Sequence, residues 1–116
     1  MRTADTLRGE LWLVDLDPTR GREQAGTRPA FVISVDSFNN GPADLVVVLP
    51  LTTRDKGIPL HIRIDPPEGG LDRVSFVKCE DIRSLSKERL VRRLGVISTD
   101  TMASVEYCLR MLLDLR

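Results

Sequence analysis

Short runs of strand-forming apolar residues recur along the chain and are separated by turn-forming residues. The run at Arg8–Leu16 alternates loosely between apolar and polar residues, which is typical of a strand. The runs at Pro29–Val35 and Leu45–Leu51 are rich in β-branched residues, which is typical of strands that are buried on both faces. We expect these three strands to form the centre of a sheet. Shorter strands are expected at 61–65, 74–78, 82–85 and 95–97.

The pattern changes to helical spacing near the end of the chain. Ser98, Thr99 or Asp100 can act as the N-cap, and apolar residues then recur three or four positions apart from Met102 to Leu113. We expect this helix to cover one end of the sheet, with a partner-binding face as the alternative. A short helical turn is also expected at 87–92. The whole pattern predicts one mainly β domain over residues 1–116, a small SH3-like β-barrel of roughly five to seven strands with a C-terminal α-helix.

The connections between these elements differ in composition. Residues 36–43 and 65–70 are rich in Asn, Gly and Pro, as turns are. Residues 17–27 form a longer, charged connection, and long connections without their own structure are often functional. Residues 53–59 are expected to form a mobile flap.

Composition excludes several classes of protein. Apolar residues make up 41% of the chain and charged residues 29%, which argues against disorder. No apolar stretch approaches the ~20 residues of a membrane-spanning helix, and residues 1–6 carry no export signal. We therefore expect a soluble cytoplasmic protein with no membrane partner. The charge is balanced, with 17 basic and 17 acidic residues, so bulk charge does not indicate a nucleic-acid partner.

Few residues offer metal-binding or acid–base chemistry. Cys79, Cys108 and the single histidine His61 match no zinc-site spacing, so no metal and no cofactor are expected. The cysteines are expected to be buried reduced thiols. His61 lies on an alternating strand, where an ordinary surface role is expected rather than a role as a general base.

One pair of side chains could act on a phosphodiester. If the strands beginning near Pro29 and ending near Leu51 pair antiparallel, Arg28 comes to lie beside Thr52. A guanidinium donates a bidentate pair of hydrogen bonds to phosphate oxygens, and a threonine hydroxyl adds one more. The alternative is that Arg28 forms a surface ion pair with Glu23 or Asp55 and that Thr52 only ends a strand.

Several separated motifs occur in a recognisable order. They are RGELW at 8–12, D-x-x-P-x-x-G-x-E-Q at 15–24, RPAFVIS at 28–34, PLTT at 50–53 and EDIRSLSKERLVRRLG at 80–95. Together they resemble the MazF/PemK family of toxin endoribonucleases over nearly the whole chain. The resemblance implies a homodimeric toxin of a type II toxin–antitoxin system, which cleaves single-stranded RNA without a metal and is blocked by a cognate MazE-like antitoxin.

The resemblance also implies site residues. The residues tied to cleavage in the family match Arg28 and Thr52, and residues near the RNA path match Glu23, Gln24, Glu80 and Asp81. We add Thr53, next to Thr52, and Phe38, the aromatic residue best suited to stack on a base.

The expected reaction is attack of the RNA's own 2′-hydroxyl on the adjacent phosphorus, giving a 2′,3′-cyclic phosphate and a 5′-hydroxyl end. Two alternatives belong to other classes of protein. One is a CcdB-like toxin that binds DNA gyrase, although this chain lacks the tryptophan expected near its C-terminus. The other is an RNA-binding barrel without activity.

Overall fold

A computed structural model describes residues 5–16 and 26–116. Within them the chain forms seven strands, two α-helices and two 3-10 turns. The strands are β1 (Glu10–Asp15), β2 (Thr27–Val32), β3 (Leu45–Thr52), β4 (His61–Ile64), β5 (Ser75–Lys78), β6 (Arg83–Ser86) and β7 (Leu90–Val96). The helices are α1 (Asp36–Asn39) and α2 (Thr99–Leu113), and the 3-10 turns are η1 (Glu68–Gly70) and η2 (Lys87–Arg89).

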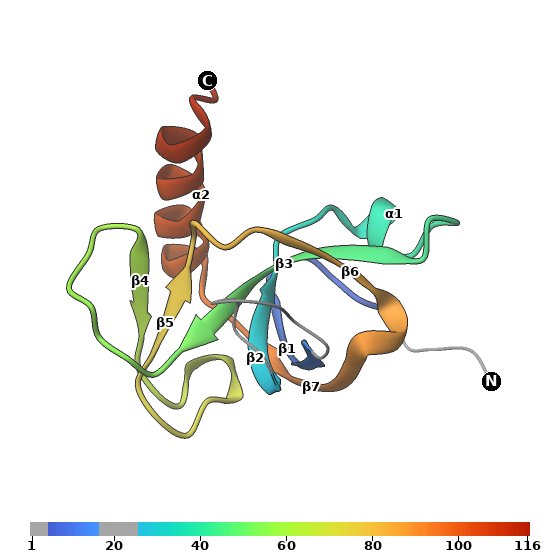
Figure 1. The fold of residues 1–116 in the computed structure, drawn as a ribbon, viewed down its shortest axis with the longest axis horizontal. Coiled ribbons are helices and arrows are strands. Elements are labelled where there is room, and N and C mark those ends of the chain that lie inside the picture. Colours follow the sequence, from blue (N-terminus) through green and yellow to red (C-terminus); the bar gives the residue numbers. More distant parts are fainter. Residues whose placement is uncertain (1–4, 17–25) are drawn as a thin grey trace.

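All strands pair antiparallel in a single curled sheet (Figure 1). The strand order is β4-β5-β3-β2-β1-β7, and β6 also pairs with β3. Strand β3 is long enough to pair with β6 along its first half and with β5 at its end. The prediction of a mainly β fold with a C-terminal helix is confirmed. The sheet is not closed, because β4 and β7 remain at its two edges.

The central strands bury side chains on both faces, as their composition predicted. Successive residues enter two different clusters: Leu11 and Phe31 belong to the core that α2 covers, whereas Trp12 and Val32 belong to a second core. Leu85 and Leu90 pack against this second core from β6 and β7. Curling of the sheet therefore buries a face that a flat sheet would leave in water.

Helix α2 begins as the sequence predicted but covers less than expected. Ser98 is its N-cap, because the Ser98 hydroxyl oxygen accepts a hydrogen bond from the backbone N–H of Thr101 at 3.1 Å. Val105 and Cys108 are buried, whereas Leu113 and most neighbouring residues of the last turn are exposed. In Figure 1 the end of the helix stands clear of the sheet, and Leu109 is the last helix residue that packs against the core.

Two local predictions were wrong. The helical turn expected at 87–92 ends at Arg89, and the chain continues from Leu90 as strand β7, which is longer than the expected strand at 95–97. Pairing with β1 explains the difference, because ladder hydrogen bonds override the modest helix propensity of this segment. The turn expected at 36–43 contains the short helix α1.

Glu10 of β1 is hydrogen-bonded to Arg93 of β7 and so connects the first strand to the last. Its buried carboxylate accepts hydrogen bonds from the backbone N–H of Leu7 at 2.8 Å and from the indole N–H of Trp12 at 3.0 Å. Its other oxygen accepts from Arg93 Nε on β7 at 2.6 Å. The RGELW motif therefore has a structural role in this fold.

In the described part of the chain, no helix is long and apolar enough to span a membrane.

Candidate active site

The register of β2 and β3 brings the two predicted reactive residues together. Ala30 pairs with Pro50, so extending the antiparallel register by two residues places Arg28 opposite Thr52. Both residues, together with Thr53, line a pocket of about 230 Å³. The expected meeting of the start of β2 with the end of β3 is confirmed.

Three neighbouring strands contribute to this pocket, which we call the polar pocket. Thr52 ends the middle strand and lies opposite Phe76 of β5 on one side and, by register, Arg28 on the other. The polar pocket is lined by Thr27, Arg28, Pro29, Leu51, Thr52, Thr53, Leu71, Asp72, Arg73 and Ser75.

The sequence analysis missed the residues that lead into β5. Asp72, Arg73 and Ser75 line the polar pocket beside Thr52. In an antiparallel pair, the start of one strand lies beside the end of the other. The argument that paired Arg28 with Thr52 could therefore have found these residues too, if β5 had been known to pair with β3. The sequence does not indicate that pairing, since β4 separates β5 from β3 along the chain.

The Thr52 hydroxyl is oriented by a backbone hydrogen bond. Its oxygen accepts a hydrogen bond from the backbone N–H of Arg54 at 3.2 Å. A hydroxyl that accepts one bond still has its own proton to donate. Thr52 is half-buried and Arg28 is exposed, so an anion entering from solvent can reach both side chains.

Phe38 lies far from the polar pocket. It belongs to α1, which follows the end of β2 and precedes β3, whereas the pocket lies at the start of β2 and the end of β3. Figure 1 shows α1 at the opposite end of β3 from its arrowhead. Glu23 and Gln24 lie outside the described residues, and so does any ion pair between Glu23 and Arg28.

Glu80 and Asp81 lie in the turn between β5 and β6 and do not line the polar pocket. Glu80 Oε2 lies 2.9 Å from His61 Nε2. Asp81 accepts two hydrogen bonds from the Arg83 guanidinium, at 2.9 and 3.0 Å, and its Oδ2 lies 3.5 Å from Lys78 Nζ. Both carboxylates therefore have intramolecular partners.

The expected surface role of His61 was wrong. Its side chain is only 2% exposed, and its Nε2 is directed towards the Glu80 carboxylate. Within the described residues, His61 Nδ1 is buried without a hydrogen-bond partner. His61 does not line the polar pocket, so its position is that of a structural residue.

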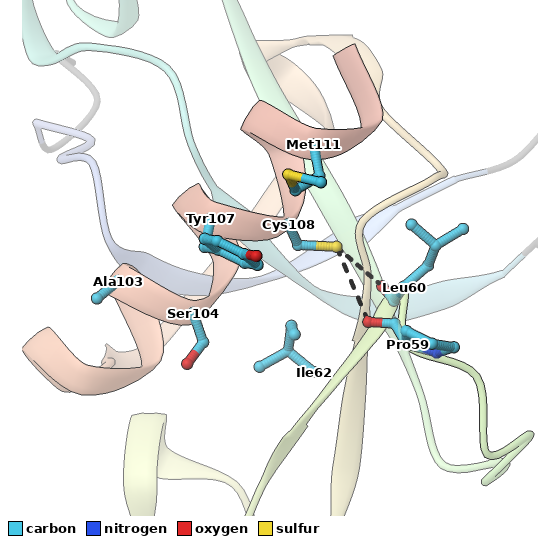
Figure 2. A pocket seen from close by; sticks show the side chains of 8 residues that line it. All are labelled: Pro59, Leu60, Ile62, Ala103, Ser104, Tyr107, Cys108 and Met111. Atoms are coloured by element: carbon cyan, nitrogen blue, oxygen red, sulfur yellow. Dashed lines mark hydrogen bonds between the residues drawn. The ribbon is translucent and has the colours of Figure 1, made fainter. Parts of the chain in front are cut away.

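A second, apolar pocket of about 630 Å³ lies between β4 and α2 (Figure 2). Tyr107 and Met111 of the helix face Ile62 of the strand across it, and Cys108 Sγ lies 3.9 Å from the carbonyl oxygens of Pro59 and Leu60. Among residues 5–16 and 26–116, those that line this pocket carry no charged side chain. It is separate from the polar pocket and offers apolar surface rather than reactive groups.

The two cysteines are buried and free, as predicted. Burial raises the pKa of the Cys79 thiol well above its usual range, and the neighbouring Cys108 thiol raises it further. Both thiols belong to the core that α2 covers. The described residues contain no group of three or more His, Cys, Asp or Glu side chains that could hold a metal ion.

Comparison with known proteins agrees with the motifs. Residues 7–113 match the family described as the PemK-like, MazF-like toxin of type II toxin–antitoxin systems. The chain is 37% identical over 113 residues to the endoribonuclease MazF9 of Mycobacterium tuberculosis, in an alignment that covers 93% of this chain and 96% of that protein.

Solved structures show the same fold. The crystal structure of MazF from Deinococcus radiodurans has a TM-score of 0.85 and 30% identity, covering 97% of this chain and 99% of that one. An endoribonuclease in complex with its cognate antitoxin, from a mycobacterial species, has a TM-score of 0.79 and 25% identity and covers 98% of both chains. On this evidence the chain belongs to the PemK-like, MazF-like family of toxins of type II toxin–antitoxin systems.

Proposed function

We propose that this toxin is an endoribonuclease that cleaves single-stranded RNA at the polar pocket, with Arg28 and Thr52 as its catalytic residues. The observation that carries the proposal is the register of β2 and β3, which brings a guanidinium and an oriented hydroxyl to one pocket. The similarity to the endoribonuclease MazF9 supports the choice of RNA as the substrate.

The reaction starts within the substrate. The 2′-hydroxyl of the RNA attacks the adjacent phosphorus, the bond to the 5′-oxygen of the next nucleotide breaks, and a 2′,3′-cyclic phosphate and a 5′-hydroxyl end result. Arg28 stabilises the negative charge that develops on the non-bridging oxygens, and the Thr52 hydroxyl donates a hydrogen bond to the same group. The backbone N–H of Arg54 holds the Thr52 oxygen in place during this step.

Arginine supplies charge rather than a base. The guanidinium does not give up its proton in proteins, so Arg28 cannot accept the proton of the 2′-hydroxyl. In this proposal the 2′-hydroxyl loses its proton to water and the departing 5′-oxygen takes a proton from water, while the protein lowers the barrier through the fixed donors Arg28 and Thr52.

The RNA path extends beyond the polar pocket. Thr53 lies in the pocket itself. We assign Glu23 and Gln24 to RNA contacts in the connection between β1 and β2, and Glu80 and Asp81 to contacts along the turn before β6. Phe38 stays a proposed stacking residue and would meet RNA only at the far end of β3.

We further propose that the toxin is a cytoplasmic homodimer and that a MazE-like antitoxin blocks its RNA site. The antitoxin assignment is supported by the MazE–MazF complex of Deinococcus radiodurans, to which this chain is similar with a TM-score of 0.81 and 30% identity. Light scattering of the purified toxin, alone and with its cognate antitoxin, tests both assemblies.

The activity is tested with purified protein and a mixed RNA pool in EDTA, followed by sequencing of the RNA ends. We expect cleavage at a limited set of sequences, with 5′-hydroxyl ends that ligate only after phosphorylation. A 2′-deoxy nucleotide on the 5′ side of the cleaved bond should abolish cleavage there, because the nucleophile is then missing.

The outcome separates this function from its alternatives. RNA that is bound but left intact would identify a non-catalytic RNA-binding protein. Loss of DNA gyrase supercoiling activity in the presence of the protein, with RNA untouched, would identify a gyrase-binding toxin. Equal cleavage of normal and 2′-deoxy substrate would contradict the mechanism while leaving the nuclease assignment intact.

A further inference from the structure

The polar pocket contains a second arginine that the proposed mechanism does not use. Arg73 lines the pocket from the segment between η1 and β5. It is exposed, and in the described part of the chain its side chain has neither an ion-pair nor a hydrogen-bond partner. Most other arginines near the sheet are engaged, as Arg63, Arg83 and Arg93 show.

The backbone that carries Arg73 is held in place. Its carbonyl oxygen accepts a hydrogen bond from the hydroxyl of Ser75 at 3.1 Å, and Ser75 is buried at the start of β5. The next residue, Phe76, pairs directly with Thr52. Arg73 is therefore fixed relative to Thr52 by a short segment of sheet.

The two arginines lie on opposite sides of the hydroxyl. In the strand order β5-β3-β2, Arg28 comes from β2, Thr52 from β3 and Arg73 from the residues leading into β5. Neighbouring strands lie about 4.8 Å apart, so β2 and β5 are separated by roughly 10 Å across β3. Long arginine side chains on either side can reach two different phosphates of one RNA strand that crosses above Thr52.

We propose that Arg73 binds the phosphate next to the cleaved one and so sets the position of the RNA strand over Thr52. This inference rests on the proposed function. Arg28 then acts on the reacting phosphate and Arg73 on its neighbour, which keeps the RNA backbone aligned along the β2-β3-β5 direction. Arg73 stabilises the bound substrate and the transition state equally, so its loss should raise KM more than it lowers kcat.

A competing explanation is that Arg73 is a solvated surface arginine beside Asp72. The salt dependence of RNA binding distinguishes the two, because each phosphate contact on a single strand contributes about 0.7 to the slope of log K against log salt. RNA affinity falls as the salt concentration rises from 50 to 200 mM. With one phosphate contact fewer, this fall in affinity is about 2.6-fold smaller.

The experiment measures binding and cleavage for Arg73→Gln, Arg73→Lys and the control Arg63→Gln. Arg63 is an exposed arginine of β4 that pairs with Asp65 and does not line the polar pocket. Binding is followed by fluorescence anisotropy with a labelled RNA that carries a 2′-deoxy nucleotide at the cleavage position, at several salt concentrations. Initial rates on the cleavable RNA give kcat and KM, and thermal unfolding checks the fold of each variant.

We expect Arg73→Gln to lower the salt slope by about 0.7 and to raise KM, while Arg73→Lys keeps most of the slope and Arg63→Gln behaves as wild type. If wild type cleaves RNA but Arg73→Gln shows the wild-type slope and KM, this inference is wrong and the proposed function stands. If wild type neither binds nor cleaves RNA, the proposed function fails, and the inference fails with it.

Discussion

Replacing Glu10 with alanine tests the role of the buried carboxylate in the RGELW motif. Glu10 is only 5% exposed and accepts hydrogen bonds from Leu7, Trp12 and Arg93. Glu10→Ala removes the two carboxylate oxygens that accept these three hydrogen bonds and leaves the three donors in place. We therefore expect a loss of stability that exceeds the effect of an ordinary surface substitution.

The magnitude follows from the exposure of each donor. The Trp12 side chain is buried, so its indole N–H loses its partner without gaining water, which costs about 1–3 kcal/mol. The hydrogen bond from the Leu7 N–H to a charged acceptor adds about 1.5 kcal/mol. Arg93 is half exposed, so solvent screens its ion pair and its loss adds little. We expect a total of ~3 kcal/mol.

Urea unfolding measures this loss directly. The helix signal in circular dichroism is a better probe than tryptophan fluorescence, because the single tryptophan, Trp12, lies at the site of the change. With an m value of about 1–3 kcal/mol per M urea, the midpoint should fall by about 1–3 M. Arg93→Gln is the control and should change the free energy of unfolding by less than about 1 kcal/mol.

Two results would refute the reasoning. If Glu10→Ala unfolds at the wild-type urea concentration with an unchanged m value, the carboxylate does not stabilise the fold. If Arg93→Gln destabilises as much as Glu10→Ala, the stabilising interaction is the ion pair rather than the bonds from Leu7 and Trp12.

Three further predictions concern the site and the core. Thr52→Ala should lower the rate of RNA cleavage by about 10² to 10³, while Thr52→Ser keeps most of it, since the hydroxyl is what the reaction uses. Gly70→Ala should destabilise the fold strongly in thermal unfolding, because a Cβ there would clash with the carbonyl oxygen of Leu94 at a φ of +75°. Gly57→Ala, at a φ of +62° in open space, should cost only about 1–2 kcal/mol. The Cys79 thiol should resist iodoacetamide at pH 8 in the folded protein and react after unfolding, because burial keeps its pKa high and the reactive thiolate scarce.

Each of these predictions has an outcome that contradicts it. Full activity of Thr52→Ala would remove Thr52 from the site. Equal thermal midpoints for the Gly70 and Gly57 variants would mean that the close approach to Leu94 relaxes freely. Rapid labelling of folded Cys79 would show that the region around α2 opens readily.

Raising the pH above the usual pKa of a thiol should also lower stability, because the unfolded chain then releases a proton that the folded chain retains.

Hydrophobic periodicity is sufficient to locate the central strands and the long helix. The apolar runs at 29–35 and 45–51 predicted strands buried on both faces, and Phe31 and Val32 do enter different cores. The Ser98 cap and the helical spacing after it located α2. These features depend on neighbours in sequence, so the sequence alone determines them.

Segment 87–96 shows where local patterns stop being sufficient. Its local sequence favours a helical turn, but Leu90–Val96 pairs with β1, which lies about eighty residues earlier in the chain. The prediction for His61 failed for the same reason, because its partner Glu80 lies 19 residues further along the chain. Distant partners decide both cases.

The candidate site divides in the same way. Arg28 and Thr52 could be paired from the sequence because β2 and β3 are consecutive strands of the central sheet. Arg73 could not be placed beside Thr52 from the sequence, because β4 separates β5 from β3 along the chain, whereas the sheet places β5 directly beside β3. The sequence by itself determined which residues could bind a phosphate, and only the tertiary structure decided which of them meet, because the order of strands in a sheet is set by the packing of the whole chain.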